Sequence, residues 1–229
     1  MQLNDKIISL MQGREVTYAA MSELFLSLIE IKQIKMLEDL MPIYEEMAEN
    51  IDNKHIKYGV SHLSEFIKEY KNSDNTLRKN LLKDYSREYS RLFCLGNAAA
   101  ISESVYVSPL HLTMQESELE VSKLYKKCNF DMKHNANEPQ DHLSYELMFM
   151  SYLSKGTYQN IEKGNKKQAE SLINLQKSFI KDHLLNWIDM FSSTIKKYKE
   201  GDRLYYPLSC LLLGYIKEDS AFIETLEKN

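Results

Sequence analysis

Apolar residues recur at steps of three and four along most of the chain, the spacing that places them on one face of an α-helix. The pattern is clear over residues 17–30, 56–70 and 77–96, and it is longest at about 168–198. No segment keeps the alternation of apolar and polar residues that a strand requires, and no repeat of fixed period is present. The sequence therefore predicts an all-α fold, a single-domain bundle of several helices.

Local signals predict where helices begin and where the chain is irregular. The polar stretch 71–76 offers side chains that can cap the helix after it. The sequence Thr-Met-Gln-Glu at 113–116 has the spacing of a capping box, which would open a helix running to about Cys128. Residues 96–112 show no helical stripe and include a Ser-Pro pair, so we expect an irregular loop there.

A polar link at about 129–137, "NFDMKHNAN", separates two helical halves. The halves are predicted to comprise about residues 1–128 and 138–229 of one domain. A polar hinge between two such halves makes their exchange between two copies possible, because each exchanged half recovers the contacts of the monomer. We therefore expect a monomer that can also form a domain-swapped dimer.

Composition and charge narrow the function classes. The 229 residues carry a formal net charge of −4, and no stripe of lysine and arginine interleaves with aromatics, which argues against a nucleic-acid partner. The longest uncharged stretch, 204–216, has 13 residues, whereas a membrane-spanning helix needs about 20. Three cysteines without any Cys-x-x-Cys pair fit a reducing compartment. With no recognisable signal peptide, a cytoplasmic protein without stable membrane insertion is expected.

The segment "NEPQDH" at 137–142 gathers two carboxylates and an imidazole within a few residues. One interpretation is a helix start, because proline is favoured in the first helical turn and Asp141 would lie in the positive field of the helix. Others are a catalytic cluster, or a zinc site made of Cys128, His134, Asp141 and His142. The spacing of that zinc set matches no standard short ligand pattern, so no metal site is predicted.

No motif for covalent or cofactor chemistry is present in the chain. It lacks a Gly-x-Ser-x-Gly elbow, a His-Glu-x-x-His pair, a phosphate-binding glycine loop and a dinucleotide fingerprint. No class of catalysis is therefore indicated by a motif, and no cofactor is predicted. His183 and Trp187 lie four residues apart on the longest periodic segment, as a buried pair or as a peptide anchor at a groove rim.

Several of these segments together resemble the TorD/DmsD-type chaperones of molybdoenzymes. "EPQDH" at 138–142, followed by "LSYELMFMSYL", is similar to the Glu-Pro-x-Asp-His signature of that family. The other segments with family resemblance, in the expected order, are "YSRLF" (89–93), "ESVY" (103–106), "FIKDHLLNWIDMF" (179–191) and "YYPLSCLLLGYIKED" (205–219). The resemblance covers roughly residues 85–220. It departs from the family at Ile101-Ser102, where relatives often carry an aromatic pair or a proline followed by an aromatic.

The resemblance implies a cytoplasmic, all-helical, non-catalytic chaperone. Its partners would be the twin-arginine leader and the apoprotein of a molybdopterin-dependent oxidoreductase, which it holds back from export until the cofactor is inserted. Glu138 and Asp141, together with Glu103, would pair with guanidinium groups. The residues implied for leader binding are Tyr89, Leu92, Phe93, Glu103, Ser104, Tyr106, Glu138, Pro139, Asp141, His142, His183 and Trp187, among which Tyr89, Leu92, Phe93, Tyr106 and Trp187 would form an apolar wall.

Two alternatives stay open at this point. One is a helical assembly factor that grips the mature enzyme subunit and ignores its leader. The other is a metal-dependent hydrolase built on Glu138, Asp141 and His142, for which metal analysis of the purified protein would be the test.

Overall fold

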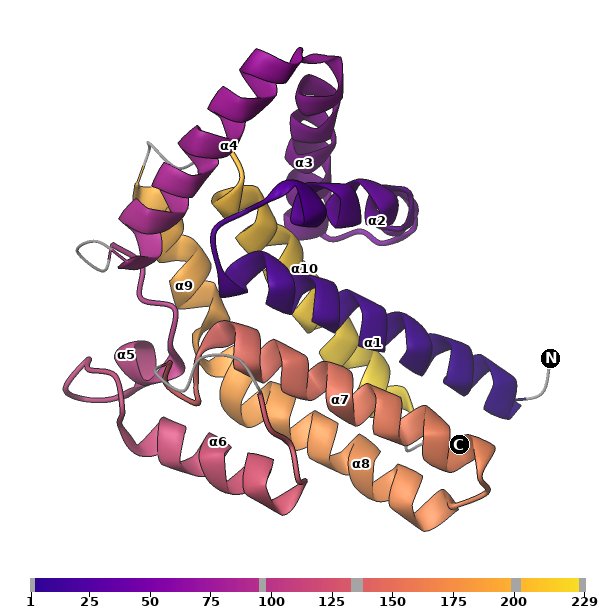
Figure 1. Ribbon diagram of the computed structural model, residues 1–229. Helices are drawn as coiled ribbons and strands as arrows, with labels where there is room; N and C mark the ends of the chain where they lie inside the picture. The colour runs from indigo at the N-terminus through magenta and orange to yellow at the C-terminus, as the bar shows by residue number, and fades with distance from the viewer. Residues whose placement is uncertain (1–2, 95–97, 133–137, 199–202, 227–229) are drawn as a thin grey trace. The chain divides into compact units, whose positions relative to one another are not determined.

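The computed structural model describes residues 3–94, 98–132, 138–198 and 203–226. These residues form helices and loops with no strand, and one isolated antiparallel bridge joins Ser102 to His142. The all-α prediction is confirmed. The helices are α1 (Leu3–Leu26), α2 (Ile31–Asn50), α3 (Lys54–Asn72), α4 (Asn75–Tyr89), α5 (Glu103–Val107), α6 (Glu116–Lys127), α7 (Leu143–Glu162), α8 (Lys166–Phe179), α9 (Leu185–Lys197) and α10 (Tyr205–Thr225), with two π-helical turns, η1 (Ser90–Cys94) and η2 (Ile180–Leu184) (Figure 1).

The chain divides into two compact units. Unit 1 comprises the described residues of Met1–Leu26, Ser102–Asn186 and Ser220–Asn229, and unit 2 those of Ser27–Ile101 and Trp187–Asp219. These units do not coincide with the halves expected on either side of the polar link, because each unit draws residues from both halves. Part of that link, residues 133–137, lies outside the described residues. Exchange of the two halves between chains stays a prediction.

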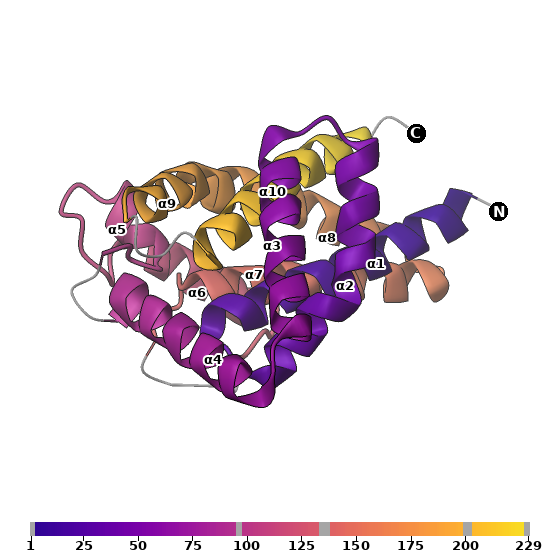
Figure 2. The same ribbon diagram turned by 90° about the horizontal axis from the view of Figure 1, so that it is seen from above.

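Unit 1 is built on three long helices. Helix α7 packs against α1 on one side and against α8 on another, and Figures 1 and 2 show these helices side by side. Aromatic side chains fill the α7–α8 contact, where the rings of Phe149 and Phe179 meet edge to face with centroids 5.0 Å apart. On α1, the predicted stripe is buried at Tyr18, Met21 and Phe25, which fixes the face that α1 turns inward.

A buried polar network ties α1 to α8 within unit 1. Arg14 of α1 donates a hydrogen bond to the side-chain oxygen of Gln176, a fully buried residue of α8. The Gln176 amide donates in turn to Thr157 Oγ1 at 2.9 Å, and Ser154 donates to Gln176 Oε1 at 3.1 Å, both from α7. Because buried polar groups are costly unless paired, this network sets the register of the three helices.

Unit 2 contains a helical hairpin of α2 and α3, followed by α4. Side-chain caps define the helix starts: Asn53 Oδ1 accepts from His55 N at 2.9 Å, and Asp74 Oδ1 accepts from Thr76 N at 2.8 Å. Asp74 is thus the capping residue that the polar stretch 71–76 predicts. Helix α3 approaches α10 closely at Gly59, where an added Cβ would lie 2.7 Å from the backbone nitrogen of Leu211.

Two expected helix starts are wrong. Helix α7 begins at Leu143 rather than at residue 138, so Pro139 and Asp141 precede it and do not form its first turn. Helix α6 begins at Glu116 after Gln115, so the expected capping box with Thr113 as its first member does not form. In both places the chain makes long-range contacts, described below, that local rules do not include.

Three further features differ from the expected pattern. Helix α2 was not predicted, and residues 96–112 contain the single helical turn α5. The long periodic segment 168–198 is interrupted by the π-turn η2, which contains His183. A π-turn inserts an extra residue into the helical hydrogen-bond ladder and is frequent at functional sites.

Among the described residues, no helix combines the length and the apolar character that crossing a membrane would require.

Candidate functional site

Asp141 joins three segments of unit 1. Its Oδ2 accepts hydrogen bonds from the backbone N–H of Ser104 at 2.7 Å, from the Ser104 hydroxyl, and from Ser117 Oγ at 3.3 Å. Its backbone carbonyl accepts from the N–H of Glu103 at 3.0 Å. Asp141 is fully buried. The segment 138–142, called the signature segment below, therefore fixes the start of α5 and the first turn of α6.

His142 is the N-cap of α7. Its Nδ1 accepts a hydrogen bond from the N–H of Ser144 at 3.2 Å, and its backbone forms the bridge to Ser102. Burial lowers the pKa of His142 to about 4, because a charged imidazole would lose its hydration. The neutral ring, with its proton on the other nitrogen, is the form that can accept at Nδ1.

The remaining residues of the signature segment are less buried than Asp141 and His142. Glu138 is exposed, and Pro139 is half-buried. The N–H of Gln140 donates to Glu118 Oε1 at 3.2 Å. The acidic first turn of α6 therefore lies against this segment. Of the three acids expected to meet guanidinium groups, Glu138 is open to solvent, whereas Asp141 and Glu103 are buried.

Glu103 and His183 form a buried pair in unit 1. His183 Nδ1 lies 2.9 Å from Glu103 Oε2, and both side chains are almost fully buried. Glu146 of α7 belongs to the same cluster, since one ligand-capable atom from each of the three residues lies within 4.8 Å of the others. The sequence analysis missed Glu146. Its signal was a single acid within the otherwise uncharged run 143–154.

The phenol of Tyr125 lies in the field of these acids. Burial raises its pKa well above the ordinary value, and the carboxylates of Glu146, Asp141 and Glu103 raise it further. Tyr125 also packs against Phe149, with ring centroids 4.8 Å apart. Three carboxylates thus share one buried region of unit 1 with a tyrosine hydroxyl.

Three of the aromatic candidates, Tyr89, Phe93 and Trp187, lie in unit 2 and are buried. Tyr89 and Phe93 meet edge to face with centroids 5.0 Å apart, and Phe93 stacks on Phe191 at 6.0 Å. The ring centroids of Trp187 and Phe191 lie 5.5 Å apart, and Trp187 is fully buried. Leu92 is almost completely buried. The twelve predicted residues therefore fall into two groups: unit 2 holds Tyr89, Leu92, Phe93 and Trp187, and unit 1 holds Glu103, Ser104, Tyr106, Glu138, Pro139, Asp141, His142 and His183.

The segment 107–119 of unit 1 exposes apolar side chains, a feature that the sequence analysis missed. Five of the fourteen exposed large hydrophobic residues among those described fall in these thirteen positions, with exposed fractions between 38% and 67%. They are Val107, Leu110, Leu112, Met114 and Leu119. His111 and Met114 have positive φ angles of 52° and 61°, which non-glycine residues rarely adopt. A concentrated apolar surface of this kind commonly marks an interaction site.

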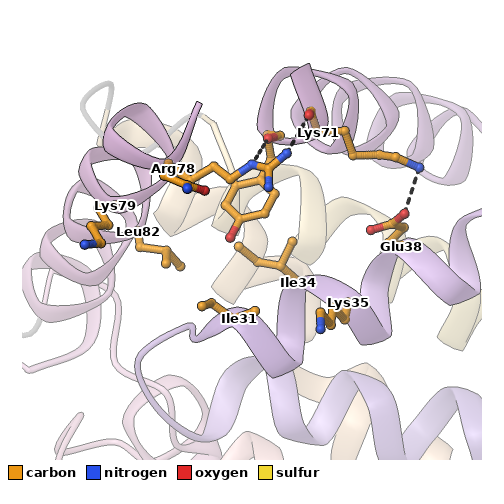
Figure 3. Close-up of a pocket in the computed structure, with 10 residues that line it drawn as sticks. Ile31, Ile34, Lys35, Glu38, Lys71, Arg78, Lys79 and Leu82 are labelled. Carbon is orange, nitrogen blue, oxygen red and sulfur yellow. Dashed lines mark hydrogen bonds and ion pairs between the residues drawn. The ribbon is translucent and has the colours of Figure 1, made fainter. Parts of the chain in front are cut away.

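Unit 2 carries a pocket of about 480 Å³ formed by α2, the end of α3 and the start of α4 (Figure 3). The cations on its rim are partly engaged: Lys71 pairs with Glu38 at 2.7 Å, and Arg78 donates from Nε to the carbonyl of Tyr70 at 2.9 Å. Figure 3 shows Lys79 and Leu82 on α4 across the pocket from Ile31. Its lining includes no histidine or cysteine, and its one acid, Glu38, is in the ion pair with Lys71. The lining residues are Ile31, Ile34, Lys35, Glu38, Tyr70, Lys71, Asn75, Arg78, Lys79 and Leu82.

The zinc set considered from the sequence is not assembled in the part of the chain that is described. His134 lies outside the described residues. Cys128, Asp141 and His142 are all described, but they do not bring ligand atoms together in one cluster. His142 and Asp141 are instead occupied by the helix cap and by the contact with Ser104. The hydrolase alternative rests on Glu138, Asp141 and His142, and these three residues likewise bring no ligand atoms together in one cluster among the described residues.

Comparisons with known proteins agree with the resemblance of the sequence. The family described as nitrate reductase delta subunit matches residues 53–193, more than half of the chain. The chain is similar to the chaperone protein TorD of Photobacterium profundum, with 28% identity over 166 residues that cover 70% of this chain and 74% of that protein. It is also similar to the chaperone protein TorD of Shewanella piezotolerans, with 24% identity over 220 residues and 91% of each chain covered. The chain therefore belongs to the nitrate reductase delta subunit family, as a TorD-type member.

Proposed function

We propose that the protein is a cytoplasmic chaperone that binds the twin-arginine leader of a molybdopterin-dependent oxidoreductase precursor and holds the precursor until its cofactor is inserted. The observation that carries this proposal is the similarity to chaperone proteins named TorD, which extends over 91% of the chain in one case. The role is one of binding and not of catalysis. The enclosed positions of Asp141 and His142 are consistent with that role.

The chemistry of a twin-arginine leader defines what its receptor needs. Two adjacent guanidinium groups call for exposed carboxylates, because charge-assisted bonds of this type are strong and directional. The apolar stretch that follows the arginines calls for an apolar surface at a distance of a few residues. A receptor for such a peptide therefore combines an acidic corner with exposed hydrophobic side chains.

Unit 1 has both features next to each other in the chain. The exposed apolar segment 107–119 runs into the first turns of α6, where Glu116 and Glu120 are exposed. Glu118 connects this region to the signature segment through its contact with Gln140. We assign guanidinium contacts to Glu138 and to these α6 acids, and contacts with the apolar stretch to the segment 107–119.

The buried members of the predicted site have a different role in this proposal. Asp141, Ser104 and His142 position α5 and the signature segment, so they act on the leader through the shape of the loop after α5. Tyr106 and Pro139 are half-buried. Tyr89, Leu92, Phe93 and Trp187 are core residues of unit 2 as described, and contact between a leader and these residues would require that unit to open.

Binding of labelled peptides to the full chain tests the proposal. Fluorescence anisotropy would compare a leader peptide containing paired arginines with the same peptide carrying paired lysines. We expect the arginine peptide to bind at least about tenfold more tightly, a difference of about 1.4 kcal/mol, because lysine cannot make bidentate contacts. Equal affinity for the two peptides, or no binding of either, would contradict leader recognition.

Matched variants test where the leader lies. Leu110→Ser with Leu112→Ser removes exposed apolar surface from the proposed site, whereas Leu10→Ser with Val16→Ser removes exposed apolar surface from α1 of the same unit. The first pair should weaken binding of the arginine peptide at least about tenfold, which corresponds to losing about 1.4 kcal/mol of apolar contact. The second pair should leave it unchanged. If the two pairs behave alike, the segment 107–119 is not the docking surface.

A further inference from the structure

Three side chains capable of binding a metal ion meet inside unit 1. They are Glu103 of α5, Glu146 of α7 and His183 of the π-turn η2, and all three are buried. One nitrogen or oxygen atom of each lies within 4.8 Å of the corresponding atoms of the other two. The residues are far apart in sequence, so the fold itself creates the cluster.

The spacing of two of these atoms already suits coordination. Carboxylate oxygens and imidazole nitrogens bind ions such as Zn²⁺ at about 2.0–2.2 Å, which places neighbouring ligand atoms roughly 3 Å apart. Glu103 Oε2 and His183 Nδ1 are separated by 2.9 Å. A modest rotation of the Glu146 side chain would bring its carboxylate to the same ion.

The charge of the surroundings favours a cation. Glu103 and Glu146 place two buried carboxylates beside one imidazole. Buried carboxylates are unfavourable unless positive charge or hydrogen-bond donors offset them. A divalent ion would neutralise the two glutamates.

A second, independent observation is that two buried oxygen atoms in this region of unit 1 lack a hydrogen-bond partner among the described residues. They are Asp141 Oδ1 and the phenol oxygen of Tyr125. Such atoms are rare in folded proteins and call for an explanation. An ion held nearby, with its own water ligands, would supply donors for them.

The backbone at His183 also departs from regular helix. Residues Ile180–Leu184 form a π-turn, although the residues on either side are α-helical. Such turns are frequent at functional sites. Here the turn contains the one histidine of the cluster.

We propose that Glu103, Glu146 and His183 form a binding site for a divalent transition-metal ion that fastens α5 and the π-turn to α7. Two carboxylates and an imidazole suit Zn²⁺ or Mn²⁺, which accept mixed oxygen and nitrogen ligands. The ion has a structural role, because the three side chains that would hold it are all buried. This inference is independent of leader binding.

Metal retention by the full-length protein tests the proposal. The purified chain is treated with a chelator, incubated separately with Zn²⁺ and with Mn²⁺, dialysed, and analysed for bound metal by mass spectrometry. We expect stoichiometric retention of at least one of the two ions, together with a rise in the thermal unfolding midpoint, because an ion that binds only the folded state stabilises it. Failure to retain either ion stoichiometrically overturns the proposal without any variant.

Isosteric variants locate the bound ion. Glu146→Gln and His183→Gln should each weaken metal binding at least about tenfold, as losses of ligands or of their immediate supports do. Glu118→Gln and His111→Gln change the same residue types outside the cluster and should bind metal as the wild type does. Circular dichroism confirms that each variant is folded. Wild-type metal content in folded Glu146→Gln and His183→Gln, or loss of the metal in His111→Gln alone, would show that the ion lies elsewhere and would refute the site.

Discussion

The carboxylate of Asp141 and the backbone N–H of Ser104 are joined by a 2.7 Å hydrogen bond across 37 residues of chain. Ser104 lies in α5, a helix of only five residues that has little stability of its own. The hydrogen bond to Asp141 therefore stabilises α5, which is too short to be stable through its own backbone hydrogen bonds. It also explains why a segment that looks like a binding motif is fully buried at Asp141.

The first prediction concerns that hydrogen bond. Asp141→Ala removes the acceptor and leaves the buried N–H of Ser104 without its partner, which typically costs about 1–3 kcal/mol. We expect urea unfolding to show a loss of about 2–3 kcal/mol for this variant. Glu138→Ala, three residues away and exposed, should change stability by no more than about 0.5 kcal/mol. Equal effects of the two substitutions would mean that Asp141 does not hold α5.

The second prediction is a dependence of stability on pH through His142. The pKa of this buried histidine is lowered to about 4 in the folded protein, whereas in the unfolded chain it is close to the ordinary 6.5. The unfolded state therefore binds the proton first as the pH falls. The contribution of His142 is complete above about pH 6.5 and is lost progressively between pH 6.5 and 4, by about 3 kcal/mol in all.

A comparison with His142→Asn isolates this contribution from that of the many carboxylates. Asparagine is a good N-cap and does not titrate. Urea unfolding at pH 7.5 and at pH 4.5 should show a larger loss of stability for the wild type than for the variant. The same loss in both proteins would exclude His142 as the source.

The third prediction concerns the contact of α3 with α10 in unit 2. A Cβ at Gly59 would lie 2.7 Å from Leu211 N and 2.7 Å from Pro207 O, and backbone atoms cannot rotate aside. Gly59→Ala should therefore destabilise the protein by about 1–3 kcal/mol. Gly13→Ala is the matched control, because nothing lies within 4 Å of its added Cβ and α1 should gain about 0.5–1 kcal/mol of helix propensity. Thermal unfolding that moves in the same direction for both variants would contradict the close contact.

The fourth prediction concerns exchange of halves between two chains. Lys155 of α7 and Glu15 of α1 form an ion pair at 3.0 Å, on opposite sides of the polar link in sequence. A carbodiimide that joins amines to carboxylates should link them within one chain in monomers. In dimers formed under mildly destabilising conditions from a mixture of ¹⁴N- and ¹⁵N-labelled protein, we expect links of mixed isotope. Links that always stay within one isotope would show that the halves do not exchange.

The sequence was sufficient for the features that depend on local pattern. Helical periodicity predicts the buried stripe of α1 and the general course of α8 and α9, and the polar stretch 71–76 contains the Asp74 cap. Helix α2 could also have been predicted, because Ile34, Leu37, Met41 and Tyr44 repeat at helical spacing and all are buried.

The remaining differences arise from contacts between distant residues. Local rules predict a helix start at Pro139. Helix α7 begins instead at Leu143, because Asp141 is hydrogen-bonded to Ser104. Ser117 likewise turns toward Asp141, and the capping box expected at Thr113 gives way to a start at Glu116. No local pattern contains these pairings, whose energies depend on residues tens of positions away.

The candidate site was predictable only in part for the same reason. The family resemblance brings the residues of α5 and the signature segment into one group, and the structure places them together in unit 1. It does not reveal which of the two acids is open to solvent, since burial of Asp141 and exposure of Glu138 follow from tertiary packing. Glu146 was not predicted as a site residue, because a lone acid in an apolar run has many possible explanations.

The central claim, recognition of an exported oxidoreductase through its leader, is tested most directly by purifying the full-length tagged protein from its native cells. Captured proteins are identified by mass spectrometry that covers their amino termini. We expect a molybdopterin-dependent oxidoreductase subunit that still carries its twin-arginine leader, in excess over the mature form, and loss of that subunit in the Leu110→Ser, Leu112→Ser variant. Capture of the mature subunit without its leader, or of no oxidoreductase at all, would contradict the account.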